Sequence, residues 1–170
     1  MPTLLSVQVF QYASSMAPDA TWLTDDEQAA WRSFLLARQL LDDALDRQLQ
    51  HDSGMPHAYY MILTTLIEAD GHAMRMSELA AELRFSPSRL THAIASIERS
   101  GWVVRRACQT DKRGQVAQLT KAGVRVQHAA AIGHVAEVRA RLFDQLTSSQ
   151  VDQLRRICTA IAGGFGTDAS

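Results

Sequence analysis

Residues 77–120 decide the fold: they read SELAAEL (77–83), RFSPSRLTHAIASIERSG (84–101) and WVVRRACQTDKRGQVAQLT (102–120). A short helical segment, a tight turn and a second helix opening at Ser86-Pro87 are predicted, because serine is a favoured N-cap and proline suits the first helical position. Residues 102–107 and 115–119 alternate around a polar turn, as in a β-hairpin. The fold class predicted is mainly α with a small β-hairpin wing, a winged helix-turn-helix.

The second helix of this segment has one apolar and one polar face. Leu90, Ile94 and Ile97 recur at helical spacing and should be buried. The remaining small polar surface suits a DNA major groove about 12 Å wide. We predict double-stranded DNA as the partner and the following DNA-binding residues on this helix: Ser86, Ser88, Arg89, Thr91, His92, Ser96 and Arg99. Arg89, near the helix N-terminus where base edges are touched, is the best candidate for a guanine contact.

The tip of the predicted hairpin is polar and basic. Lys112 and Arg113 complete the predicted DNA-binding set, because they could reach phosphates or the minor groove, whose negative potential attracts arginine. Asp111 is predicted to support the wing by holding the Arg113 guanidinium through charge-assisted hydrogen bonds. In the first helix of the pair, Ser77 is predicted as the N-cap.

Charge is unevenly distributed, although the chain of 170 residues carries a net charge of only −1. Residues 84–125 hold nine basic and two acidic residues, a net of +7, whereas residues 19–52 hold three basic and eight acidic residues, a net of −5. One face would therefore attract phosphate and the other would repel it. A composition of 46% hydrophobic and 21% charged residues excludes disordered and collagen-like classes.

Long helices are predicted on both sides of the DNA-reading segment. Thr24 and Glu27 have capping-box spacing and should open a helix over 24–52. Pro56 opens a more apolar helix with Tyr59, Met61, Ile62, Leu66 and Ile67 as predicted core.

Two further helices are expected after the hairpin. Thr120 should cap one that runs from Lys121 to about Leu146, and Thr147 and Gln150 form a second capping box. The last helix carries an apolar stripe at spacings of three and four: Val151, Leu154, Ile157 and Ile161. Such stripes suit a two-fold interface between copies.

The predicted organisation is a single domain over 24–165. Within it, 24–52 and 121–163 are expected to be dimerisation helices and 56–120 the winged helix-turn-helix. Residues 1–23 are expected to form an arm or a short helix, and 166–170 a frayed end. Residues 1–18 contain no Lys or Arg, so a secretory signal is not indicated, and no apolar run approaches the length of a membrane span.

The segments SELAAEL, SRLTHAIASIERSGWVVRR, the wing pattern Asp111-Lys112-Arg113 and LTKAG together resemble the MarR family of bacterial transcriptional regulators. The resemblance covers about residues 25–162. It implies a homodimer in which the first and the last two helices of each subunit interlock. It also implies repression at a palindromic operator, relieved by a small phenolic or other anionic ligand, a metal or an oxidant.

The resemblance also suggests where an effector would bind. Family pockets lie between the dimer helices and the reader, which gives as candidate ligand-binding residues Trp31, Arg38, His57, Tyr60 and Arg125. An aromatic ring beside a cation suits an aromatic carboxylate or a phenolate.

Other classes of site find little support. Cys108 and Cys158 are far apart and suggest no disulfide or metal pair, and the first helix carries no cysteine of the kind used by the family's redox branch. Cys158 lies on an apolar helix expected to form the dimer, where a buried thiol is usually inert. His128 and His134 should face different sides of their helix, so no zinc site is expected, and no cofactor.

No enzyme signature is present, so the chain is not expected to be an enzyme, and a reducing cytoplasm is the expected location. The alternative function is a winged-helix module that binds a partner protein without reading DNA.

Overall fold

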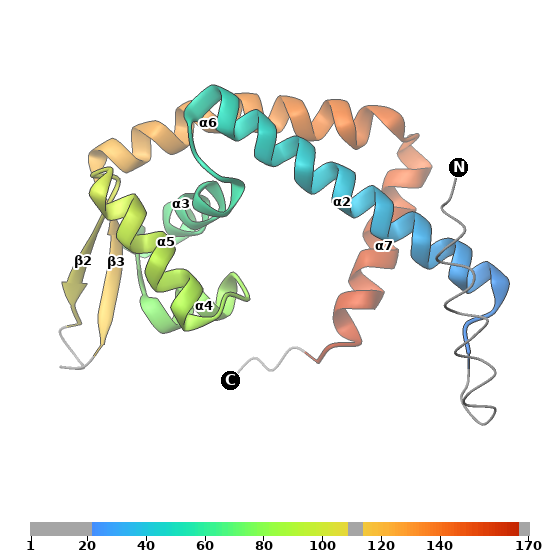
Figure 1. Ribbon diagram of the computed structural model, residues 1–170, viewed down its shortest axis with the longest axis horizontal. Helices are drawn as coiled ribbons and strands as arrows, with labels where there is room; N and C mark the ends of the chain where they lie inside the picture. The colour runs from blue at the N-terminus through green and yellow to red at the C-terminus, as the bar shows by residue number, and fades with distance from the viewer. Residues whose placement is uncertain (1–21, 109–113, 167–170) are drawn as a thin grey trace. The chain divides into compact units, whose positions relative to one another are not determined.

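The computed structural model describes residues 22–108 and 114–166 (Figure 1). The chain divides between Leu40 and Leu41 into two compact units, and helix α2 (Asp25–Ser53) contributes residues to both. The predicted capping box opens this helix: the Glu27 amide donates to Thr24 Oγ1 at 3.2 Å and the Thr24 amide donates to Glu27 Oε2 at 2.7 Å. Gly54, with φ of 63°, follows the helix in the conformation that favours glycine at helix ends.

The second unit begins with the rest of α2 and continues into α3 (His57–Glu68). Asp46 of α2 accepts a hydrogen bond of 2.8 Å from the His57 amide, so a carboxylate satisfies one of the unpaired donors at the start of α3. A 3-10 turn, η1 (Asp70–His72), leads into strand β1 (Ala73–Arg75).

The buried face of α3 differs in part from the prediction. Ile62 and Leu66 are fully buried as expected, but Met61 is 38% exposed, and Tyr59 and Ile67 are only partly buried. The other residues of α3 in the core are Tyr60 and Leu63. A helix that is apolar on most sides does not reveal by its pattern which stripe its neighbours will cover, and here the neighbours include α5, α6 and β3.

Helices α4 (Met76–Glu82) and α5 (Pro87–Arg99) form the predicted pair. Ser77 is not the N-cap of α4, which contradicts the prediction; Arg75 is, and its amide lies 3.4 Å from Glu78 Oε2. The reason is that β1 runs directly into α4, so the last strand residue provides the extended backbone that an N-cap requires.

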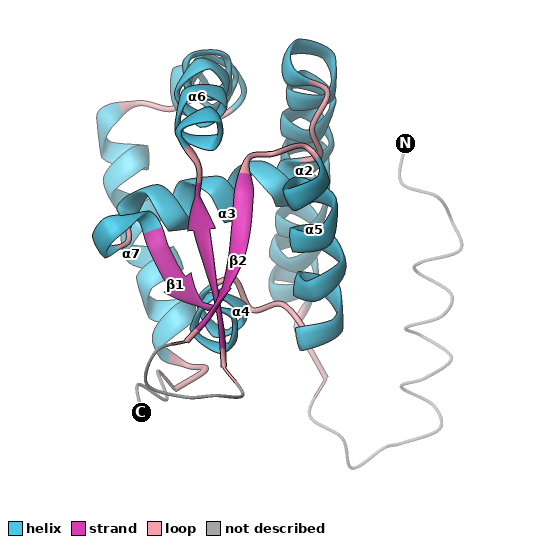
Figure 2. Ribbon diagram, turned by 90° about the vertical axis from the view of Figure 1, so that its left-hand side faces the viewer, coloured by secondary structure: helices cyan, strands magenta, loops and turns pink. Residues whose placement is uncertain are grey.

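The sheet has three antiparallel strands rather than the two of the predicted hairpin (Figure 2). Strands β2 (Val103–Ala107) and β3 (Gln115–Leu119) pair as expected, with Val103 opposite Leu119. Strand β1 adds to the other edge of β3, with Met74 opposite Ala117. Three residues are too short to show an alternating pattern, so the sequence does not predict β1.

Helix α6 (Lys121–Arg141) is shorter than predicted, since it ends before Leu142 rather than near Leu146. Asp144 accepts from the Arg139 guanidinium at 3.2 Å, and the Gln145 side chain donates to the Ala140 carbonyl at 2.9 Å. In the turn η2 (Phe143–Gln145), the Gln145 side chain thus satisfies a backbone carbonyl that another helical turn would have bonded to a backbone amide.

Helix α7 (Ser148–Gly163) starts at the predicted capping box, where the Thr147 amide donates to Gln150 Oε1 at 2.8 Å. Its apolar stripe is only partly covered in the single chain: Val151 and Leu154 are half-buried, whereas Ile157 is 56% exposed and Ile161 is 48% exposed. Within the part of the chain that the structure describes, no helix has the length and apolarity needed to cross a membrane.

Candidate nucleic-acid interface

Helix α5 is the element that positions most of the predicted DNA-binding side chains. Ser86 Oγ accepts the Arg89 amide at 3.2 Å, and Pro87 occupies the first helical position, both as predicted. The side chains of Leu90, Ala93, Ile94 and Ile97 are buried in the core. This apolar stripe fixes the rotation of the helix and leaves its other face to solvent.

The predicted helix residues that the structure describes share this outward face. All are exposed except Ser96, which is half-buried: Ser86, Ser88, Arg89, Thr91, His92 and Arg99. Lys112 and Arg113, together with Asp111, lie outside the described residues. The structure therefore brings seven of the nine predicted DNA-binding residues onto one element.

Arg89 has a partner that the sequence did not suggest. Its guanidinium carbon lies 4.0 Å above the centre of the Phe85 ring, the geometry of a cation–π contact. Phe85 belongs to the turn that precedes α5, four residues before Arg89. The aromatic residue four positions before the arginine is the sequence signal that could have predicted this contact. The contact restricts the arginine at the end of the helix where base contacts are expected.

The side chain of Arg99 turns back along its own helix. Its Nε and Nη2 atoms lie 3.4 Å from the Ala95 carbonyl and from Ser96 Oγ, respectively. Such contacts at the limit of hydrogen-bond distance on an exposed side chain are weak, so the guanidinium can still turn toward a phosphate.

Glu98 ties the outward-facing helix to the wing. The carboxylate accepts from the Arg105 amide at 2.9 Å and from Arg105 Nε at 2.8 Å, and Nη2 lies 2.7 Å away. These bonds from the Arg105 amide and guanidinium lower the pKa of Glu98. The Arg105 charge is thus committed to holding β2 against α5, whereas Arg106, the next residue, is exposed. Counting charges along the sequence could not separate these two roles.

Thr120 ties the other strand of the wing to the end of α5. Its hydroxyl donates to the Gly101 carbonyl at 2.7 Å and accepts the Gly123 amide at 3.0 Å. The Thr120 amide donates to the Trp102 carbonyl at 3.0 Å. One side chain therefore caps α6 and fixes the strand ends of the hairpin relative to α5.

The candidate effector residues belong to three helices, and two of them lie close together. His57 and Tyr60 lie together on α3, with ring centroids 6.5 Å apart, and Arg125 is exposed on α6. Trp31 and Arg38 belong to the first unit, and both are exposed.

His134 of α6 completes an aromatic cluster that the sequence did not predict. Its ring centroid lies 4.3 Å from that of Tyr60 and 5.4 Å from that of His57. Burial lowers the pKa of both histidines, and the nearby charge of His57 lowers that of His134 further. The cluster favours neutral imidazoles.

The described histidines, cysteines and carboxylates do not form a further candidate site. Among the described residues, no group of three or more His, Cys, Asp and Glu side chains could hold a metal ion. Cys108 is half-buried. Cys158 is exposed in the single chain, and the expectation that it is buried on a dimerisation helix stays a prediction, because it requires a second subunit.

Comparison with known proteins adds independent evidence. A family model described as the MarR family matches residues 53–114. Sco3205 of Streptomyces coelicolor, a MarR family transcriptional regulator solved in complex with DNA, is 46% identical; the match covers 89% of this chain and 95% of that one, with a TM-score of 0.84. This chain belongs to the MarR family.

Two curated relatives are similar over a shorter stretch of this chain. The regulator PrsX of Escherichia coli is 34% identical over 71 residues, which are 42% of this chain and 43% of PrsX. The transcriptional repressor MprA of Escherichia coli K12 is 33% identical over 70 residues, 41% of this chain and 40% of MprA. The chain thus matches less than half the length of these relatives. All of these relatives are regulators of transcription, in keeping with the prediction that this MarR-family chain is not an enzyme.

Proposed function

We propose that this MarR-family protein binds double-stranded DNA and regulates transcription as a homodimer at a palindromic operator, as a repressor that a small aromatic or anionic ligand releases. The observation that carries the DNA-binding part is the outward face of α5. It presents Arg89, Thr91 and His92 from a helix that a serine cap and a buried apolar stripe hold in place. The relative Sco3205, nearly half identical, was solved with DNA.

Dimer formation is supported by apolar side chains left open on the terminal helices. Ile132 and Val135 of α6 are 77% and 56% exposed, and Ile157 and Ile161 of α7 are also exposed. Large aliphatic side chains in such numbers are typical of surfaces that a second subunit covers. Two copies related by a two-fold axis would present two reading helices about one turn of DNA apart.

The effector part of the proposal is supported by the aromatic residues His57 and Tyr60 on α3, with Trp31, Arg38 and Arg125 as further candidates. A cytoplasmic location is proposed as well, since the operator DNA would lie there.

The first test measures the affinity for DNA at two salt concentrations. The protein is titrated against a duplex from its own upstream region, with and without aromatic acids. A reader that makes about 6 to 10 phosphate contacts should lose roughly 10³ to 10⁵ in affinity between 50 and 200 mM salt. No binding to any duplex, with retained binding to a partner protein, would instead favour the alternative of a protein-interaction module. Sedimentation should give twice the mass of the 18.8 kDa chain.

Single arginine substitutions test which residue reads bases. Arg89→Ala should weaken binding by about 1–3 kcal/mol and blur base preference, whereas Arg113→Ala should weaken binding to all sequences alike. Arg47→Ala removes an exposed arginine from the acidic part of α2 and serves as the control. Equal, sequence-independent losses from Arg89→Ala and Arg113→Ala would remove Arg89 from the set of base-reading residues.

A further inference from the structure

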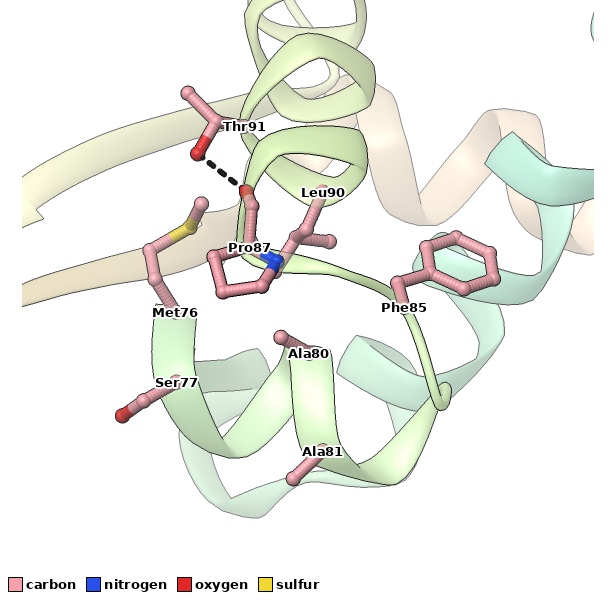
Figure 3. Close-up of a pocket in the computed structure, with 8 residues that line it drawn as sticks. All are labelled: Met76, Ser77, Ala80, Ala81, Phe85, Pro87, Leu90 and Thr91. Atoms are coloured by element: carbon pink, nitrogen blue, oxygen red, sulfur yellow. Dashed lines mark hydrogen bonds between the residues drawn. The ribbon is translucent and has the colours of Figure 1, made fainter.

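An apolar depression of about 370 Å³ lies between α4 and the start of α5 (Figure 3). Eight residues line it: Met76, Ser77, Ala80, Ala81, Phe85, Pro87, Leu90 and Thr91. Ala80 and Leu90 are buried and form its floor, while Ser77, Pro87 and Thr91 are exposed at its rim. The lining carries no charged side chain.

The depression adjoins the outward face of α5 proposed to read DNA. Thr91 belongs both to this face and to the rim, and the ring of Phe85 that lines the depression also holds the Arg89 guanidinium. The Thr91 hydroxyl donates to the Pro87 carbonyl at 2.8 Å, so its proton is committed within the helix (Figure 3). An apolar, uncharged surface thus lies next to a cation at the helix end where base contacts are expected.

The chemistry of this surface selects one feature of the major groove. Phosphates are bound by cations and hydrogen-bond donors, and the edges of guanine, adenine and cytosine present donors and acceptors; the C5-methyl group of thymine is the apolar feature. We propose that the depression receives thymine C5-methyl groups, so that thymine is preferred at the operator position facing Thr91 and Pro87. A methyl group is about as large as a water molecule, which occupies roughly 30 Å³. The depression is larger than that, so it can receive the methyl groups of adjacent thymines.

This inference rests on the proposed DNA binding and predicts a measurable preference. Removing one methyl group from an apolar contact should weaken binding about fourfold. Deoxyuridine has the same hydrogen-bonding edge as thymidine and lacks only this methyl group, so it isolates the contact.

The experiment first selects the preferred duplex from a randomised pool and then replaces each thymidine in turn by deoxyuridine. Kd is measured for the full-length protein with each duplex. We expect about a fourfold rise in Kd at one position or two adjacent positions of each half-site. Thr91→Ser keeps the hydroxyl and removes a rim methyl group, so the ratio between the two duplexes should fall toward 1. Thr159→Ser is the matched control, because the Thr159 hydroxyl likewise donates within its helix, to the Arg155 carbonyl at 2.8 Å.

The outcomes separate the two proposals. Binding that is equal for thymidine and deoxyuridine at every position overturns the thymine pocket and leaves DNA binding intact, whereas no binding to any duplex overturns the proposed function itself. Methyl NMR signals of Met76 and Thr91 should shift when the duplex is added. If they shift instead with protein concentration alone, or only with an added aromatic acid, the depression belongs to a second copy or a small ligand, and the thymine assignment is wrong.

Discussion

Replacing Gly123 by alanine tests how α6 is joined to the wing. Gly123 lies in the first turn of α6, where an added Cβ would stand 2.1 Å from the Trp102 carbonyl oxygen and 2.9 Å from Leu119 Cδ2. The Trp102 carbonyl cannot easily move aside, because it accepts the Thr120 amide at 3.0 Å. The new methyl group would therefore push α6 away from the strand ends of the hairpin.

The expected cost follows from two opposing effects. Overpacking typically destabilises by about 1–3 kcal/mol, and contact with a fixed backbone oxygen favours the upper end of that range. Alanine is the better helix former by about 1 kcal/mol, which offsets part of this cost. The net loss in the free energy of unfolding should be about 2 kcal/mol, or about 4–8 °C in Tm for a chain of this length.

Thermal and urea unfolding followed by circular dichroism at one protein concentration would measure this difference. Gly163→Ala is the matched control: it lies in α7 with nothing within 4 Å of the added Cβ, so it should be neutral or stabilise by up to about 1 kcal/mol. A Gly123→Ala protein as stable as the wild type, or one that changes in the same direction as Gly163→Ala, would refute this account of the junction.

Two further predictions concern titratable groups. Burial lowers the pKa of His57 and His134, so near their ordinary pKa the unfolded chain binds more protons than the folded one. The stability that the neutral rings contribute should therefore be present above about pH 6.5 and be lost as the pH falls below it. Tm measured from pH 7.5 to 5.5 should drop less in His134→Phe than in the wild type, because this variant keeps an aromatic ring beside Tyr60 but cannot be protonated. Glu98→Gln should lower the urea midpoint at pH 7 more than Glu137→Gln does. Glu137 pairs with Arg141 one turn along the same helix, whereas Glu98 joins α5 to β2. Since the pKa of Glu98 is lowered on folding, this difference should disappear as the pH falls below about 4.5 through the folded value, and a difference that persists in acid would contradict the assigned ion pair.

Local chemistry made much of this protein predictable from its sequence. The caps at Thr24, Ser86 and Thr147 use hydrogen bonds between residues three apart, and such bonds depend on the order of residues alone. The stripe of Leu90, Ile94 and Ile97 fixes the buried face of α5 and with it the candidate DNA-binding face. These features, and the family motifs, are properties of short segments.

Tertiary structure alone decided the contacts between distant segments. Strand β1 becomes a strand only because β3 offers it an edge, and Met61 is exposed because α5, α6 and β3 cover a different stripe of α3. The approach of His57 to His134 and the pairing of Glu98 with Arg105 depend on how helices and strands pack. Periodicity shows whether a residue will be buried or exposed, but the three-dimensional arrangement sets which neighbour it contacts. The reason is that the hydrophobic free energy depends on the apolar area removed from water and not on which residue covers it.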